Sequence, residues 1–160
     1  MINIFDFVNQ RVFGGDKVLD LGCGDKKIAK TLATENIVYV DVWPKAEPDI
    51  ILDLNEAKLP FQDQEFDVVL MLDIIEHLDK CRGRALLPEV QRVTKREIIL
   101  LTPLKWDDNK IPTRSPTSFY YQNQHNYHRS LWSKKDFPSG NGWQRHAVEH
   151  NFYYVGVWSR

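Results

Sequence analysis

The sequence of 160 residues predicts an α/β fold built on one doubly wound, mostly parallel sheet. Three observations predict it. Short apolar segments alternate with segments of helical periodicity. One apolar segment ends in two glycines, Gly22 and Gly24, directly before a helix-forming run. Residues 50–54 are almost continuously apolar, as in a parallel strand buried on both faces. The length fits a single domain, 1–160, with a sizeable core.

The first expected element is an amphipathic helix at 2–12, because Ile4, Phe5, Val8 and Val12 fall on one helical face. Strands are expected where short apolar runs are bounded by turn residues, and helices where apolar residues recur every three to four positions. In chain order these are a strand at 17–21, a helix at 25–34, strands at 37–41, 50–54 and 66–72, a helix at 85–93 and a strand at 97–101.

The pattern changes after Pro103. Residues 105–137 form a long polar segment that is rich in aromatic residues and carries His125 and His128. A loop of this length in a compact domain is usually functional or disordered, and the aromatic content argues against disorder. We expect a lid that orders over a bound ligand, with a solvated structural insertion as the alternative. Two strand-like runs at 143–148 and 152–158, with a turn at Glu149–Asn151, predict a C-terminal hairpin.

The turn at Gly22–Gly24 is the first candidate binding site. Glycine lets the backbone turn sharply and lets a ligand lie against it, because no Cβ intrudes. A helix that starts at 25 would direct its free N–H groups toward the turn. Such strand–turn–helix units bind nucleotide-like cofactors at the carboxyl ends of parallel strands. The alternative is an ordinary tight turn that Asp20 caps through backbone N–H groups.

The residues around this turn narrow the choice of cofactor. Lys27 stands where a dinucleotide fingerprint has its third glycine, and the sequence has no P-loop pattern. Asp20 places a carboxylate at the turn, which suits a ligand with a cationic amino-acid end. Asp41 ends the next strand about 20 residues further on, where a carboxylate meets ribose hydroxyls. Together these carboxylates indicate S-adenosylmethionine (SAM).

These residues and the segments after them resemble the class I SAM-dependent methyltransferases, and among them the small type 11 methyltransferase domain. The resemblance covers roughly residues 15–104. It implies a Rossmann-like sheet whose last strand is inserted antiparallel. The matching segments are Val18–Gly24 (motif I), Val40–Asp41 (the ribose-binding acid), Asp53–Asn55 with Leu59–Phe61 (the adenine side), Phe66–Leu70 with Asp73–Leu78 (motif IV and the residues after it) and Arg92–Pro103 (the next helix–strand unit).

The resemblance implies that SAM, and its product S-adenosylhomocysteine (SAH), bind at the carboxyl ends of the first strands. Cys23 is expected to be a small packed residue and not a nucleophile. Trp43 is either a stacking face for the adenine or a packed aromatic. The residues expected to bind the cofactor are Asp20, Gly22, Cys23, Gly24, Asp41, Val42, Asp53, Leu54 and Leu72.

The candidate catalytic residues are His77, His128 and Glu76. Methyl transfer from a sulfonium is an in-line displacement, so the protein must align the acceptor and accept any proton that it loses. Imidazole titrates near neutral pH, and Glu76 and His77 follow the strand at 66–72 at the rim of the sheet. The alternative for His77 is a residue that fixes local geometry. No metal site is expected, because His125 and His128 have no clear third ligand beside them.

Composition and motifs limit the acceptor and the partners. The net charge of −1 gives no general attraction to nucleic acid, although basic residues gather at Arg82–Arg84 and Lys134–Lys135. Residues 72–75 lack the Asn/Asp-Pro-Pro-Tyr/Phe element typical of enzymes that methylate the exocyclic amines of bases or glutamine. Cys81 is not part of the Pro-Cys pair of cytosine-ring methylases. Two cysteines form no disulfide framework, and the sequence has no signal peptide or membrane-length apolar run, so a cytoplasmic protein is expected.

The expected function is therefore a SAM-dependent methyltransferase that acts on an unidentified small-molecule acceptor. Two alternatives remain open: a non-catalytic subunit that binds SAM or SAH, and a methyltransferase directed at nucleic acid. Few residues follow the last parallel strand. Acceptor recognition could therefore depend on a partner subunit or on self-association.

Overall fold

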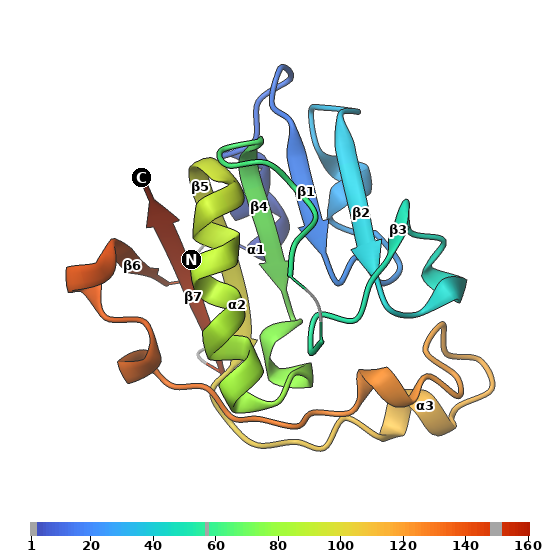
Figure 1. Cartoon of the computed structure of the whole chain (residues 1–160). Helices are drawn as coiled ribbons and strands as arrows, with labels where there is room; N and C mark the ends of the chain where they lie inside the picture. Colours follow the sequence, from blue (N-terminus) through green and yellow to red (C-terminus); the bar gives the residue numbers. More distant parts are fainter. Residues whose placement is uncertain (1–2, 57, 148–151) are drawn as a thin grey trace.

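A seven-stranded sheet forms the centre of the molecule (Figure 1). The computed structural model describes residues 3–56, 58–147 and 152–160. The strand order is β3-β2-β1-β4-β5-β7-β6, with β1 to β5 parallel and the last two strands antiparallel, so the predicted α/β, Rossmann-like fold is confirmed. The strands are β1 (Val18–Leu21), β2 (Ile37–Asp41), β3 (Ile50–Ile51), β4 (Phe66–Leu72), β5 (Thr94–Pro103), β6 (Trp143–His146) and β7 (Tyr153–Ser159).

One helix packs on each face of this sheet (Figure 1). Helix α1 (Ile4–Asn9) lies behind it in the view of Figure 1, and helix α2 (Lys80–Val93) lies in front. Successive residues of β4 point to opposite faces, so Val68 packs with the α1 side and Val69 with the α2 side. Strands β1 and β4 are buried along their central residues, because they are covered on both faces.

The expected helix at 25–34 is wrong. A single 3-10 turn, Ala29–Thr31, is found there. Lys26 has a φ of 60°, and its N–H bonds to the carbonyl oxygen of Cys23 at 2.8 Å. A left-handed residue interrupts a helix at its start, so no long helix points its dipole at the glycine turn. The lysine-rich composition favours a helix, but the geometry of the turn overrides it.

Other boundaries differ from the prediction in ways that burial explains. The expected strand at 50–54 contracts to two residues at the sheet edge, where Ile51 is 60 % exposed. Helix α2 begins at 80 instead of 85, since its first turn has little apolar periodicity to detect. Strand β5 is longer than 97–101, and α1 ends at Asn9. The hairpin pairing of β6 and β7 is confirmed, while its predicted turn at 149–151 lies outside the described residues.

The segment at 105–137 passes below the carboxyl ends of the parallel strands (Figure 1). Its first part carries the short helix α3 (Ile111–Arg114) and a 3-10 turn at Gln124–Asn126. Its last part joins the core, because Trp132 is 1 % and Phe137 4 % exposed. The structure thus divides the expected lid into an outer segment, 105–128, and a core-anchored segment, 129–137.

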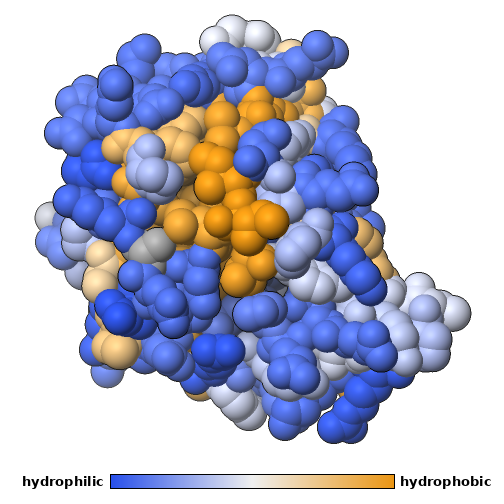
Figure 2. Space-filling model, turned by 45° about the vertical axis from the view of Figure 1, so that its right-hand side comes forward, coloured by the Kyte–Doolittle hydropathy of each residue, from blue (hydrophilic) through white to orange (hydrophobic). Residues whose placement is uncertain are grey.

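Hydrophobic residues gather in a band on the face shown in Figure 2. Around β2 and β3 the hydrophobic side chains are only partly covered: Val38, Ile50 and Leu52 pack against the core and retain exposed surface. In the described part of the chain, no helix combines the length and apolar character that crossing a membrane requires.

Candidate functional site

The glycine turn after β1 uses left-handed backbone angles, which glycine adopts more readily than other residues. Gly22 and Gly24 have φ values of +72° and +47°. A Cβ on Gly24 would lie 2.7 Å from the hydroxyl oxygen of Tyr120, and one on Gly22 would lie 2.4 Å from Ile74. The turn therefore requires both glycines, for their backbone angles and for close approach.

The N–H groups of this turn are already satisfied by the protein. Gly22 donates to the carbonyl oxygen of Val40 at 2.8 Å, and Gly24 donates to Oδ2 of Asp41 at 2.9 Å. The other oxygen of Asp41 accepts from the N–H of Trp43 at 2.8 Å. Asp41 thus ties the ends of β1 and β2 together. Because these N–H groups already have partners within the protein, the contribution of the glycines that the structure shows is to leave room beside the turn.

Asp20 is a buried carboxyl group directly below the turn, only 6 % exposed. Burial, reinforced by the negative charge of Asp41, raises the pKa of Asp20 to about 7. A cation placed beside it would favour the carboxylate form. Cys23 is also buried, and burial together with these two carboxyl groups raises the pKa of its thiol to about 12. Cys23 is therefore a packed residue and no nucleophile at neutral pH.

The rim after β4 brings three further titratable groups to the same edge of the sheet. Asp73 has a φ of 52° and donates its N–H to the carbonyl oxygen of Leu101, which turns the chain into the 3-10 turn Ile75–His77. Glu76 is 1 % exposed, and burial together with Asp73 raises its pKa well above the usual range. Burial, with the nearby His128, lowers the pKa of His77 to about 4.

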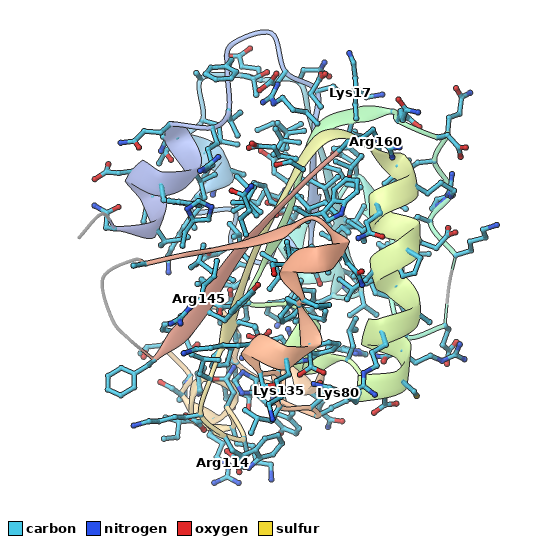
Figure 3. All side chains as sticks on the ribbon, turned by 90° about the vertical axis from the view of Figure 1, so that its left-hand side faces the viewer. Lys17, Lys80, Arg114, Lys135, Arg145 and Arg160 are labelled. Atoms are coloured by element: carbon cyan, nitrogen blue, oxygen red, sulfur yellow. The ribbon has the colours of Figure 1, made fainter. Side chains whose placement is uncertain are left out.

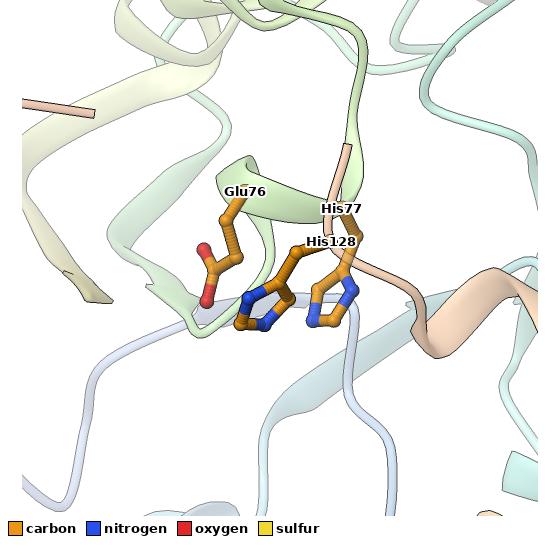
Figure 4. A group of neighbouring side chains, drawn as sticks. All are labelled: Glu76, His77 and His128. Carbon is orange, nitrogen blue, oxygen red and sulfur yellow. The ribbon is translucent and has the colours of Figure 1, made fainter. Parts of the chain in front are cut away.

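His128 reaches this rim from the outer segment (Figure 4). The carbonyl oxygen of Glu76 accepts hydrogen bonds from the N–H groups of Arg129 and Ser130, at 2.8 and 3.0 Å. This pair of bonds holds the chain so that the rings of His77 and His128 lie 4.8 Å apart between centroids. Burial lowers the pKa of His128 as well, so both imidazoles are neutral at pH 7.

Aromatic residues connect the outer segment to the glycine turn, and the sequence did not identify this contact. Tyr120 lies against Gly24, and its ring stacks on Trp43 with centroids 6.2 Å apart. Phe119 meets Trp43 edge-on at 5.2 Å. Trp43 therefore packs against protein rings in this structure. The aromatic content of residues 105–137 indicated that this segment packs against something, but it did not indicate that the partner is Trp43.

One cavity of about 510 Å³ joins most of the predicted site. Its volume falls in the range of small-molecule sites. The predicted residues that line it are Asp20, Gly22, Cys23, Gly24, Asp41, Val42, Leu72, Glu76, His77 and His128. Asp53 and Leu54 line a smaller adjoining cavity that shares Gly22, Asp41 and Val42 with the first. Asp73, which the sequence places in the segment after motif IV, also lines this cavity. Lining residues that the sequence did not single out include Tyr120, Asn123 and Tyr153.

Comparison with known families agrees with this geometry. A family model described as a methyltransferase domain, of type 11, matches residues 19–102, which is more than half of the chain. This chain belongs to that family. It is a class I SAM-dependent methyltransferase, and SAM is its cofactor. The match spans the glycine turn, Asp41 and the rim with Glu76 and His77, and it ends before the outer segment begins.

Solved structures share the fold of this methyltransferase at low identity. A SAM-dependent methyltransferase from Methanosarcina mazei is 16 % identical, with a TM-score of 0.67 and 99 % of each chain covered. One from Archaeoglobus fulgidus is 17 % identical, with a TM-score of 0.61, covering 98 % of this chain and 94 % of that one. A protein from Haloferax volcanii in complex with the Trm112 methyltransferase activator is 15 % identical, with a TM-score of 0.58, covering 92 % and 84 %.

Proposed function

We propose that this methyltransferase transfers the methyl group of SAM to a small-molecule acceptor held between the rim after β4 and the outer segment, 105–128. The observation that supports this proposal most directly is the cavity that continues from the glycine turn to Glu76, His77 and His128. A cofactor-binding module without catalysis needs only the first part of that cavity. Convergent polar groups at its far end support a place where an acceptor is bound.

In the proposed complex, each strand end binds one part of the cofactor. Asp20 lies beside the ammonium group of the methionine end, because it is the buried carboxyl at the turn. Asp41 accepts from the ribose hydroxyls with lone pairs that its two backbone contacts leave available. Asp53 and Leu54 lie beside the adenine, in the smaller cavity. The methyl group then points toward the β4 rim.

The proposed catalytic groups are His77 and His128, with Glu76 beside them. Both imidazoles are neutral at pH 7, which leaves each ring a lone pair to orient an acceptor or to take its proton. A histidine that accepts the proton at its ordinary pKa would make the rate rise with pH between about 6 and 7. Because burial lowers both pKa values, we expect this rise at lower pH. Alignment and desolvation of the acceptor supply the rest of the rate increase.

Replacing Asp41 with alanine is expected to weaken SAH binding by about 1–3 kcal/mol, or roughly 5- to 150-fold, the cost of losing hydrogen bonds to a charged group. Isothermal titration calorimetry measures it. Asp41 also accepts from the N–H groups of Gly24 and Trp43 on its two different oxygens, so Asp41→Asn keeps the side-chain shape but only one of these two hydrogen bonds. Circular dichroism of both variants checks that the fold is retained. No measurable heat from SAM or SAH with the wild-type protein, alongside clear binding of NAD, would contradict the proposed site.

The outer segment is expected to gain protection from hydrogen exchange when SAH binds. Tyr120 lies at the glycine turn, so a ligand there contacts the segment directly and should reduce its local opening. Residues 129–132 provide the internal control, since the N–H groups of Arg129 and Ser130 already bond to the carbonyl oxygen of Glu76 and Trp132 is buried. Equal protection of 105–128 with and without SAH would indicate a fixed structural insertion.

Nucleic acid is the less favoured acceptor. The structure does bring the two predicted basic runs together, but Asp136 pairs with Lys80 at 2.9 Å and with Arg84 at 3.0 Å. Other basic residues, such as Lys17, Arg145 and Arg114, are spread along the molecule in Figure 3.

A partner subunit or a second copy of the chain is a further proposal. The hydrophobic band shown in Figure 2 is the candidate surface for this contact. Two free cysteines fit a location in the reducing cytoplasm.

A further inference from the structure

We propose that Glu76, His77 and His128 form a binding site for one divalent transition-metal ion, such as Zn²⁺. Each of these residues offers one ligand atom, and the three atoms lie within 4.8 Å of one another (Figure 4). Two imidazole nitrogens and one carboxylate oxygen, with further positions open, are a donor set that binds first-row transition metals. The site goes beyond the proposed function, because methyl transfer from SAM does not itself require a metal.

Glu76 provides evidence for a bound cation in addition to the pair of histidines. Its Oε2 accepts from the hydroxyl of Thr102 at 3.0 Å, but its Oε1 is buried and has no hydrogen-bond partner among the described residues. A buried carboxyl oxygen without a partner is costly. A cation between Glu76 and the two rings would satisfy this oxygen and would favour the ionised carboxylate.

The two histidines are prepared as ligands by the backbone around them. Nδ1 of His77 lies 3.2 Å from the carbonyl oxygen of Tyr127, a contact that assigns the proton to Nδ1 and leaves the lone pair of Nε2 for a metal. The hydrogen bonds from Arg129 and Ser130 to Glu76 place His128 beside the same point. These contacts orient metal-ligating side chains in the way that outer-shell partners do.

The site as it stands is wider than a bound ion requires. Ligands about 2.0–2.1 Å from a tetrahedral ion lie about 3.4 Å from one another, compared with up to 4.8 Å here. The rings and the carboxylate must therefore close by roughly an ångström on binding. His128 belongs to the outer segment, whereas Glu76 and His77 belong to the rim, so this closure would draw the segment onto the rim. The open coordination positions face the cavity where the acceptor is proposed to bind.

With the ion bound, the histidines would hold the acceptor through the metal and would not accept its proton. The ligand class that fits the open positions is a molecule with an oxygen donor, such as a hydroxyl, which the ion would orient and make more acidic, so that its proton could pass to water in the cavity. Selectivity should favour Zn²⁺, Co²⁺ or Mn²⁺ over Mg²⁺, since two of three donors are nitrogen and Mg²⁺ prefers oxygen.

Calorimetric titration of chelator-treated protein with ZnCl₂ tests this inference. One ion per chain is expected, with weaker binding of MgCl₂. Glu76→Gln, which keeps the side-chain shape, and His128→Ala should each reduce the Zn²⁺ affinity at least tenfold, and Thr102→Val about tenfold through the carboxylate that it supports. His125→Ala is the matched control from the same segment, because His125 is exposed and lies outside the cluster, and its affinity should stay within twofold of wild type.

Absence of Zn²⁺ binding at micromolar concentrations would overturn the proposal, as would an equal loss in His125→Ala and His128→Ala. Unchanged Zn²⁺ affinity in the Glu76→Gln variant would also overturn the proposal. Circular dichroism serves to check that this isosteric variant is folded. Titration of the same variants with SAH separates the two hypotheses. If SAH binds and Zn²⁺ does not, only the metal-site proposal is rejected. If Zn²⁺ binds and SAH does not, only the proposed cofactor site is rejected.

Discussion

Replacing Trp132 with alanine is expected to lower the free energy of unfolding by about 3–5 kcal/mol, the range for large aromatic residues in cores. Trp132 is 1 % exposed and stacks on Phe137, and its Nε1 donates to the carbonyl oxygen of Ile75 and to the hydroxyl of Ser130, at 3.1 and 2.9 Å. Its loss would leave a cavity and buried polar atoms without partners. Urea unfolding followed by circular dichroism measures the change.

Trp106 is the matched control, since it lies in the outer segment and is 57 % exposed. Trp106→Ala should change the free energy of unfolding by no more than about 0.5 kcal/mol. A second variant, Gly83→Ala, approaches the same contact from α2, because a Cβ there would lie 2.5 Å from the indole ring of Trp132. Comparable stability of Trp132→Ala and Trp106→Ala would show that 129–137 is as loosely held as the outer segment.

The contrast between these two tryptophans illustrates what the sequence could predict. Both belong to a polar segment without apolar periodicity, so composition alone assigned them to one lid. Their burial depends on contacts with residues distant in the chain, such as the carbonyl oxygen of Ile75. Strands β1, β2 and β4 were located well, because a buried parallel strand requires a run of apolar residues that is visible locally.

The helix expected at 25–34 failed for a related reason. Propensity favoured it, but the backbone after Gly24 is fixed by the turn, and Lys26 takes a left-handed conformation within it. Propensity amounts to a few tenths of a kcal/mol per residue, and tertiary context overrides it easily. The edge strand β3 shows a different limit of the sequence pattern: residues 50–54 are apolar apart from Asp53, yet Ile51 is exposed, so an apolar run did not imply burial.

At the candidate site, residues at the ends of predicted strands were brought together as expected. Asp20, Asp41 and Leu72 line one cavity because parallel strands end at a common edge. The sequence assigned His77 and His128 to the same acceptor site, but it did not predict the direct contact of their rings, because this contact depends on two backbone hydrogen bonds to Glu76. The sequence around a histidine in a long loop does not indicate which distant residue it will contact. The only possible metal-ligand pair that the sequence suggested was His125 with His128.

The affinity for SAH is expected to rise with pH between 5 and 7 and then to level off. In the free protein the pKa of Asp20 is raised to about 7, chiefly by burial and also by Asp41, so below pH 7 the carboxyl group is protonated. The ligand's ammonium group remains charged over this range and favours the ionised form of Asp20. Binding must then release a proton from Asp20, and the affinity changes by as much as about tenfold per pH unit well below pH 7, or roughly 50-fold in total from pH 5 to pH 7.

Calorimetry at several pH values, in buffers of different ionisation enthalpy, measures both the affinity and the proton released. Asp20→Asn should bind SAH more weakly at pH 7 and show a flat profile between pH 5 and 7. 5′-Methylthioadenosine, which lacks the amino-acid end, is the matched ligand, and its affinity for the wild-type protein should not follow the same slope. An equal slope for both ligands would place the titrating group elsewhere and would remove Asp20 from the proposed ammonium site.

Asp20 should also make the stability of the ligand-free protein depend on pH, and this stability should fall with rising pH where the affinity for SAH rises. An unfolded Asp ionises near pH 3.9, whereas Asp20 in the folded protein ionises near 7, so the folded state binds more protons between these values. The contribution of Asp20 to stability therefore falls as pH rises from 4 to 7, and Asp20→Asn should remove that fall. Urea unfolding of the two proteins at pH 5 and pH 7 isolates this contribution from those of other carboxyl groups. A larger stability loss in the variant than in the wild type across this interval would mean that Asp20 is charged in the folded protein, and its proposed pairing with the ligand's ammonium group would then release no proton.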